Sequence, residues 1–223
     1  MAVLQNDLRD GAGPDLGRRR LLQFSAAAGG TLLLPRGAAA QTREPRKGGT
    51  LRVAFPDAPR TLDPQASVSF TEQQYSRLLF DSLTALDAAS QPVPALATAW
   101  RAENDATEWV FDLRQGVKIH VVAPLTVDDV VFASRRILNP EFSRPQLSQF
   151  DTIVAAEATA PDKVVLRTRV PYPVLLAQLV KLSIVSQAYV ERLGNEEFNR
   201  RPMGSGPYRF VSWQSGVRVT LEA

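Results

Sequence analysis

The chain has 223 residues, 44% of them hydrophobic, and its 26 Lys and Arg against 23 Asp and Glu give a formal net charge of +3. Such a chain can bury a sizeable core, in one large domain or two small ones. Because cysteine is absent, disulfides, thiolate nucleophiles, cysteine-ligated zinc and a lipid-modified cysteine are excluded.

The charge is distributed unevenly along the chain. Residues 1–40 contain five arginines and three aspartates, so the remaining residues are nearly neutral. Because these remaining residues are nearly neutral and contain no dense cluster of basic residues, they do not have the charge distribution of a nucleic-acid-binding protein. We therefore expect no nucleic-acid partner.

The first 40 residues have the three regions of an export signal. A basic start, a weakly apolar middle and a small-residue end lie at 18–20, 21–34 and 38–40. The pair Arg18-Arg19 resembles the twin-arginine export signal, and Gly29, Gly30 and Pro35 interrupt the apolar stretch, which is too short to span a membrane. We expect residues 1–40 to be a twin-arginine-type signal peptide of a periplasmic protein and residues 41–49 to be a linker.

The next segment contains a predicted strand, a loop and a helix. TLRVAF (50–55) alternates apolar and polar residues, which predicts a strand with one apolar face. TLDPQASVSF (61–70) is a proline-containing loop. Thr71 is expected to cap a helix whose apolar stripe is formed by Tyr75, Leu78, Leu79 and Leu83.

Three further pairs of elements follow. EWVFDL (108–113) and VKIHVV (117–122) predict a hairpin, and Thr126 with Asp129 forms a capping box that opens a helix over 127–138. Asp128 and Asp129 are adjacent in the first helical turn, where acids are favoured, so we expect helix capping rather than acid–base chemistry. Residues 152–170 predict a second hairpin with its turn at 160–162, and a helix is expected over 174–182.

Glycines near the end of the chain raise the question of a phosphate loop. Gly204-Ser205-Gly206 precedes Pro207 and an alternating run, YRFVSW, which predicts a strand. A phosphate-binding glycine loop opens a helix instead. These glycines are therefore expected to be structural.

The catalytic inventory is small. His120 is the only histidine, and no Gly-x-Ser-x-Gly elbow accompanies it. A periplasmic hydrolase using His120 remains an alternative to the binding function below, but a structural role for this residue is favoured. No metal site or cofactor is expected.

Several segments together resemble the N-terminal half of the family 5 extracellular solute-binding proteins. They follow the order of that family from about Gly48 to Ala223. The segments are GGTLRVAFPDAPRTLDPQ, FDSLTALDAASQPVPALATAW, WVFDLRQGVKIH, PLTVDDVVFASRRILNP, AYVERLG and MGSGPYRFVSW. The family includes the dipeptide- and oligopeptide-binding components of ABC importers, and also nickel and glutathione binders.

The resemblance implies a fold and a division of the chain. The fold class is α/β, a periplasmic binding protein-like, two-lobe, type II fold that is truncated here to its first lobe and an inserted subdomain. Residues 50–75 and 184–223 would form the discontinuous first-lobe sheet, 76–183 an inserted α+β subdomain, and the second lobe would be absent because family members are longer. One departure is the segment 120–124, where the family has an Asp-Gly turn.

The resemblance also implies a function and a site. The protein would be the non-enzymatic, monomeric receptor of an ABC transporter, binding a peptide or peptide-like solute and docking on membrane permease subunits. Nickel or another metal chelate is the alternative ligand. By resemblance, first-lobe ligand contacts come from the loop after LDP, namely Ser67, Val68, Ser69 and Phe70, and an extended peptide could exchange backbone hydrogen bonds with Ser67 and Ser69.

Overall fold

Two units make up the chain, residues 1–52 and 53–223, and all helices and strands below belong to the second. The computed structural model describes residues 48–120, 123–142 and 144–223. The expected signal peptide and residues 41–47 of the expected linker lie outside the described residues. Within the described part of the chain, no helix is long and apolar enough to cross a membrane.

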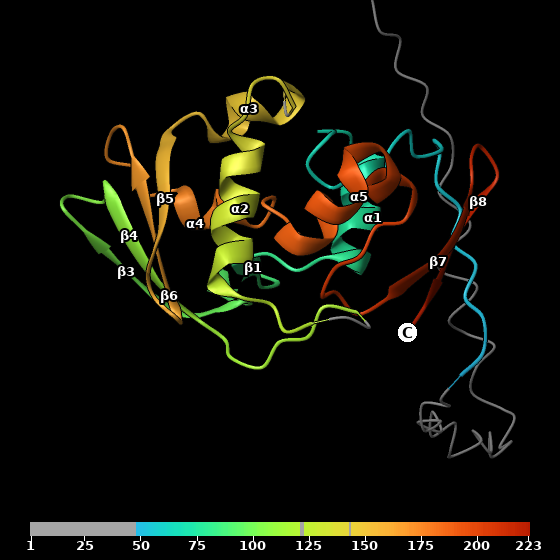
Figure 1. Ribbon diagram of the computed structural model, residues 1–223, viewed down its shortest axis with the longest axis horizontal. Coiled ribbons are helices and arrows are strands. Elements are labelled where there is room, and N and C mark those ends of the chain that lie inside the picture. The colour runs from blue at the N-terminus through green and yellow to red at the C-terminus, as the bar shows by residue number, and fades with distance from the viewer. Residues whose placement is uncertain (1–47, 121–122, 143) are drawn as a thin grey trace, which may run out of the picture. The chain divides into compact units, whose positions relative to one another are not determined.

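Within residues 53–223 the helices lie between a larger β-sheet and a two-stranded β pair (Figure 1). The helices are α1 (Phe70–Leu79), α2 (Val127–Ile137), α3 (Arg144–Phe150), α4 (Leu175–Leu179) and α5 (Gln187–Arg200). The strands are β1 (Thr84–Leu86), β2 (Pro92–Pro94), β3 (Ala97–Glu103), β4 (Glu108–Leu113), β5 (Ile153–Ala160), β6 (Lys163–Thr168), β7 (Arg209–Gln214) and β8 (Arg218–Glu222). They form an antiparallel sheet of order β3-β4-β6-β5 and two antiparallel pairs, β1-β2 and β7-β8.

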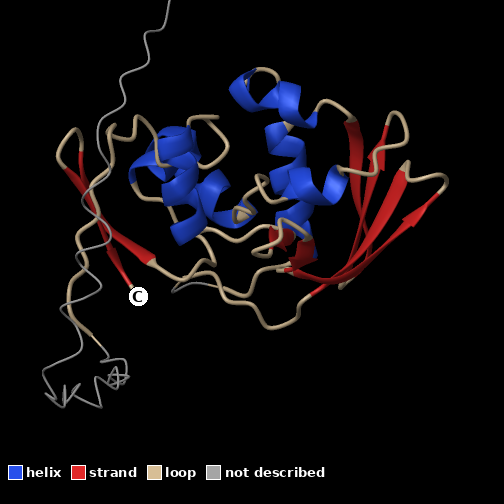
Figure 2. Ribbon diagram, turned by 180° about the vertical axis from the view of Figure 1, so that it is seen from behind, coloured by secondary structure: helices blue, strands red, loops and turns tan. Residues whose placement is uncertain are grey.

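The four-stranded sheet forms the main core with α2. Trp109, Phe111 and Leu113 of β4 point to the same face of the sheet, and Val164 and Leu166 of β6 join them in the buried cluster. This alternation is the one predicted for 108–113, and the predicted hairpin of 152–170 is confirmed as β5-β6. Helix α2 packs on this face of the sheet (Figure 2), so the sheet and its helix form a two-layer unit.

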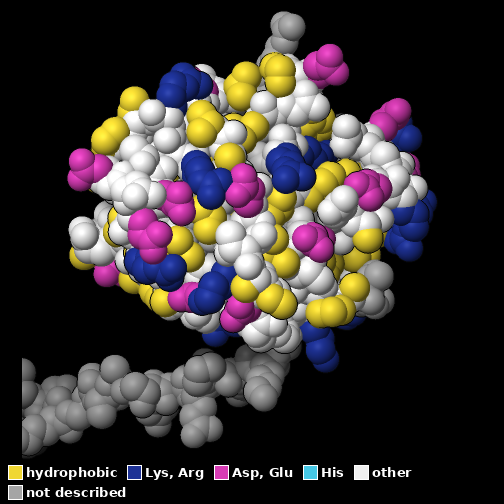
Figure 3. Space-filling model, turned by 60° about the vertical axis from the view of Figure 1, so that its left-hand side comes forward, with side chains coloured by type: hydrophobic (Ala, Val, Ile, Leu, Met, Phe, Trp, Pro, Cys, Tyr) yellow, Lys and Arg dark blue, Asp and Glu magenta, His cyan; other side chains and the backbone are white. Residues whose placement is uncertain are grey.

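Ion pairs cover the opposite face of this sheet. Val110 and Val165 are direct cross-strand partners there and are buried. Arg167 lies 3.2 Å from Glu108 and 2.6 Å from Glu157, and Lys163 pairs with Asp112. Figure 3 shows positive and negative side chains mixed on this side of the molecule. Long charged side chains thus shield two valines while their charged groups stay in water.

The start of α2 confirms the predicted capping box. Thr126 accepts a hydrogen bond from the backbone of Asp129, and Asp129 Oδ2 accepts one from Thr126 N at 2.8 Å. The other oxygen, Oδ1, accepts from Gln187 N at 2.8 Å, at the first residue of α5. Asp128 is exposed. Asp129 therefore joins the starts of two helices, and the two acids do not converge on a shared site.

Four local predictions are wrong. Residues 50–55 form no strand, and Leu51 and Val53 are 86% and 62% exposed; alternation indicates an apolar face but supplies no hydrogen-bonding neighbour. Ser69, not Thr71, is the N-cap of α1, and Leu83 lies beyond its end. Strand β4 pairs with β3 and β6 rather than with the segment from residue 117, and in the described part of that segment Lys118 forms a bridge with Pro124. The helix expected over 174–182 is limited to α4.

The Gly204–Tyr208 segment, called the return loop below, docks on the C-terminal end of α1. Gly206 N donates to Leu79 O at 3.0 Å, and Tyr208 N donates to Leu78 O at 3.0 Å. The last carbonyl groups of a helix have no hydrogen-bond partner within the helix, and the N–H groups of this loop supply those partners. Since the N–H groups of Gly206 and Tyr208 already donate to carbonyl oxygens, they are not available to a phosphate, which supports the structural interpretation of the glycines.

We predict that Gly206→Ala destabilises the fold by roughly 2–4 kcal/mol, because it combines overpacking with the loss of docking hydrogen bonds. An added Cβ would lie 2.6 Å from Leu79 C, against backbone that cannot rotate away. The control is Gly116→Ala, which meets open space and has only an unfavourable φ of +74°. Urea denaturation measures both, and equal losses for the two variants would contradict the docking role.

Candidate ligand-binding site

A buried ion pair fixes the loop that contains the predicted ligand residues. Asp63 receives two hydrogen bonds from Arg136 of α2, with Oδ1 3.0 Å from Nη1 and Oδ2 2.5 Å from Nη2. The two side chains are only 2% and 6% exposed. Two parallel bonds from a planar guanidinium fix orientation as well as distance. Residue 63 is thereby placed precisely relative to α2.

The remaining contacts of Arg136 extend the connection to α5 and to the residue after Pro64. Its Nη2 donates to Asn195 Oδ1 at 2.8 Å, and its Nη1 donates to Gln65 Oε1 at 3.0 Å. The guanidinium carbon lies 3.7 Å from the centre of the Phe142 ring, a cation–π contact. Both terminal nitrogens of the Arg136 guanidinium are hydrogen-bonded and its face is covered by an aromatic ring. The buried charge therefore avoids the free-energy cost of burying an unpaired ion.

Two amide side chains hold the loop on either side of Asp63. Asn199 Oδ1 accepts from Leu62 N at 2.7 Å and from Asp63 N at 3.2 Å. Gln146 Nε2, from α3, donates to Pro64 O at 2.7 Å and also to Ser67 O. Residues 62–67 are therefore bound by three helices, which leaves the following residues on a rigid support.

The four predicted ligand residues lie together immediately after this support. Ser67 is half-buried, whereas Val68, Ser69 and Phe70 are exposed, Val68 at 41% and Phe70 at 73%. The chain there enters α1, and Ser69 has φ −66° and ψ 144°. A large exposed aromatic side chain on a rigid base is a suitable contact for an apolar group of a ligand.

Several polar groups of the loop expected to exchange backbone hydrogen bonds through Ser67 and Ser69 already have partners within the chain. Ser67 O already accepts from Gln146, Ser69 N donates to Ser67 Oγ at 3.1 Å, and Ser69 O accepts from Gln73 N at 3.1 Å. Among the described residues, the N–H group of Val68 has no partner. The N–H group of Val68, an exposed residue, is therefore one donor open to a ligand backbone.

His120 does not form a catalytic arrangement. Its backbone N donates to Gly204 O at 2.9 Å, and its ring Nε2 lies 2.7 Å from Gly206 O. Since a carbonyl oxygen only accepts, Nε2 carries the proton, and the other ring nitrogen, Nδ1, is buried without a hydrogen-bond partner among the described residues, so no serine or carboxylate is bonded to it. His120 instead holds the return loop, the structural role favoured by the sequence. Within the described ranges, no group of three or more metal-binding side chains is found.

Comparison with known proteins gives one family match. The sequence pattern of the bacterial extracellular solute-binding proteins, family 5 Middle, matches residues 91–223. The matched residues begin before β2 and include the four-stranded sheet, the anchoring helices α2, α3 and α5, and the return loop.

Individual relatives agree with that match. Di/tripeptide-binding protein 2 of Pseudomonas aeruginosa is 30% identical over 199 residues, which are 78% of this chain and 37% of the relative. The structure of NikZ from Campylobacter jejuni in complex with Ni(L-His) is 28% identical, with a TM-score of 0.68, and the match covers 75% of this chain and 34% of NikZ. The chain thus spans about a third of the length of these proteins.

A third relative supports the fold. The oligopeptide-binding protein AppA of Bacillus subtilis, solved with a nonapeptide, has a TM-score of 0.69 at 23% identity, over 74% of this chain and 34% of AppA. The mixed α/β fold expected from the sequence is therefore confirmed as matching part of a peptide-binding protein structure.

We predict that Arg136→Met destabilises the fold by about 3–5 kcal/mol, because it leaves the Asp63 carboxylate buried without its partner. Arg135→Met is the matched control: Arg135 is exposed on the same helix, and its loss should change the free energy of unfolding by less than about 0.5 kcal/mol. Adding Asp63→Asn to Arg136→Met should recover part of the loss. Equal effects of the two single variants in urea denaturation would contradict the anchoring role of the pair.

Proposed function

The chain belongs to the family 5 bacterial extracellular solute-binding proteins, and we propose that it binds peptides or peptide-like solutes for import by an ABC transporter. The observation that carries the proposal is the rigidly anchored loop that presents Val68 and Phe70 to solvent. Relatives named as di/tripeptide- and oligopeptide-binding proteins support it. As a member of a family of binding proteins, the chain is not an enzyme, so the hydrolase alternative is wrong.

The proposed architecture is the two-lobe, type II arrangement. Residues 50–75 and 184–223 contribute to the first lobe and 76–183 form an inserted subdomain, in a chain that spans about a third of the length of its relatives. Enclosure between lobes removes water from the ligand and adds contacts from both sides. For the present chain alone we therefore propose weak binding, and a ligand must be offered at millimolar concentration.

The proposed ligand contacts are those of Ser67, Val68, Ser69 and Phe70. An extended peptide would accept a hydrogen bond from the N–H group of Val68 and place an apolar side chain against Phe70. Backbone contacts of this kind tolerate many side chains. The support for this assignment is geometric: the four residues are adjacent, all but the half-buried Ser67 are exposed, and Gln146 and Asp63 hold the residues before them.

A nickel chelate is the second candidate ligand. The observation that favours it is the similarity to NikZ, which was solved with Ni(L-His). With no cluster of metal-binding side chains in the described part of the chain, the amino acid would have to ligate the nickel, and the protein would bind the chelate through that amino acid. Titration with Ni(L-His) in place of peptide separates the two candidates.

We predict that the tripeptide Ala-Ala-Leu binds the purified chain, and that Phe70→Ala weakens this binding about tenfold, as for loss of one aromatic anchor. The change should leave thermal stability nearly unaltered, because Phe70 is 73% exposed. Val174→Ala, at a side chain 52% exposed in another loop, is the control. NMR titration of the Val68 amide measures the affinity, and unchanged affinity in Phe70→Ala would refute the site.

We further propose periplasmic localisation through the twin-arginine route, followed by docking on permease subunits as a monomer. Changing both Arg18 and Arg19 to Lys should trap the precursor in the cytoplasm, because lysine preserves the charge but not the signal. Cell fractionation with immunoblotting measures the distribution. Undiminished export of the double variant would exclude this route in favour of the general secretory one.

A further inference from the structure

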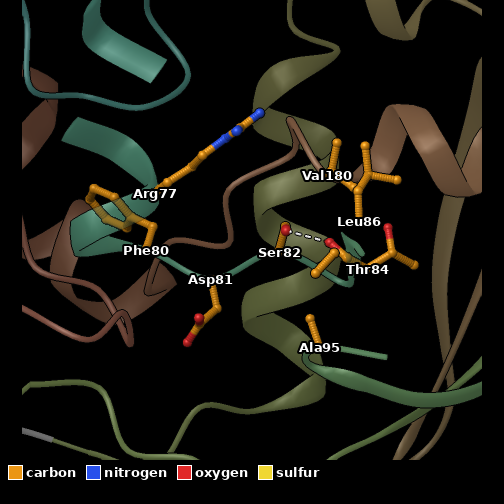
Figure 4. Close-up of a pocket in the computed structure, with 9 residues that line it drawn as sticks. Arg77, Phe80, Asp81, Ser82, Thr84, Leu86, Ala95 and Val180 are labelled. Carbon is orange, nitrogen blue, oxygen red and sulfur yellow. Dashed lines mark hydrogen bonds between the residues drawn. The ribbon is translucent and has the colours of Figure 1, made fainter. Parts of the chain in front are cut away.

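A small apolar pocket, called the α5 pocket below, lies where the first turns of α5 meet the residue before the return loop. Ile119, Ala188, Tyr189, Arg192 and Met203 are among its lining residues, and its volume is about 60 Å³. Pockets for small molecules have volumes of about 300–1,000 Å³, a range that the pocket beside α1 just reaches at about 300 Å³ (Figure 4). The α5 pocket therefore fits one side chain rather than a whole ligand.

The walls of the α5 pocket are fixed by contacts within the fold. The hydroxyl of Tyr189 donates to Arg201 O at 3.1 Å, and its ring meets the buried Phe198 ring edge-on, with the centroids 6.1 Å apart. On another wall, Ile119 is only 4% exposed, and its backbone N donates to Ala123 O at 2.9 Å. A pocket with walls held in this way is present before anything enters it.

Arg192 adds an unpaired positive charge beside this pocket. It is exposed, and its guanidinium carbon lies 5.2 Å from the centre of the Tyr189 ring, a cation–π contact that orients the group. The nearby acid Glu197 pairs instead with Arg200, at 3.8 Å, and with Arg201, at 2.9 Å. Within the described part of the chain, no acid forms an ion pair with Arg192. Its charge is therefore open to an acid from outside the chain.

This combination has the features of an anchor point in a protein interface. Tyrosine and arginine are enriched among the residues that contribute most to such interfaces, and these residues surround pockets that one partner side chain fills. We propose that the α5 pocket binds a partner protein, which inserts one aliphatic side chain and places a neighbouring carboxylate on Arg192. The pocket shares no residue with the proposed ligand contacts, so this interaction goes beyond ligand binding.

The test uses a blocked dipeptide, acetyl-Leu-Asp-amide, in NMR titrations of the purified chain at millimolar concentration. Methyl signals of Met203 and Ile119 report the α5 pocket, and the Val68 amide reports the ligand loop. Acetyl-Leu-Asn-amide should bind the pocket about fivefold more weakly, since it cannot form the exposed ion pair with Arg192. Acetyl-Ala-Asp-amide should bind at least about tenfold more weakly, since it lacks the aliphatic group that fills the pocket.

Two variants assign these effects to the pocket. Arg192→Gln should remove the difference between the Asp and Asn peptides, whereas Arg135→Gln, at an exposed arginine of α2, should keep it. Ala188→Leu places a larger side chain at an exposed lining position and should abolish the shift at Met203 by filling the pocket. Because Arg192 and Ala188 are both exposed, thermal unfolding of the two variants should match that of the wild-type chain.

Three results would overturn the proposal. Equal affinities of the Asp and Asn peptides for the wild-type chain would exclude the role of Arg192. Unchanged binding in Ala188→Leu, or shifts at Val68 without shifts at Met203 and Ile119, would exclude the pocket. Shifts at Met203 that grow with protein concentration in the absence of peptide would identify a second copy of this chain as the occupant. Binding at the ligand loop is read separately at Val68, so failure of this proposal does not decide the proposed function.

Discussion

The buried pair of Asp63 and Arg136 is the interaction on which the arrangement of the site depends. Its two charges lie in the protein interior, where replacement by apolar residues of similar size is often neutral or even stabilising. The contribution of the pair is therefore mainly positional. Because Arg136 also contacts Asn195 and the Phe142 ring, one side chain sets the relative positions of α2, α5 and the ligand loop.

Periodicity predicted the elements that carry their own signals. The capping box of Thr126 and Asp129 and the hairpin of β5 and β6 each need only neighbours in sequence, and both were predicted correctly. Pairings between strands that are far apart in the sequence could not be predicted from periodicity. Strand β4 looked like half of a hairpin with residues 117–122, yet it pairs with β3, an alanine-containing strand with few β-branched residues, and with β6.

The place of the proposed site came from the sequence, whereas the contacts that support its loop could not be predicted. The loop containing Val68 and Phe70 could be located from its family context, whereas no local signal indicated that Gln146 and Asn199 would bind its backbone. Each is one of several polar residues in its helix, and such residues are usually exposed to solvent. The same applies to the occupied groups of Ser67, since an acceptor's partner depends on tertiary packing rather than on spacing.

The contacts that close the site have a consequence for the order of folding. Leu62 and Asn199 are 137 residues apart, and His120 and Gly206 are 86 apart, whereas β5 and β6 are joined by a short turn. Closing a long loop costs conformational entropy before the contacts at its ends can form, so contacts between residues far apart in the sequence form slowly. During synthesis from the N-terminus, α1 therefore stays without its C-terminal partners until the ribosome has released the return loop. Until then the carbonyl groups of Leu78 and Leu79, at the end of α1, have no return loop to pair with and depend on water.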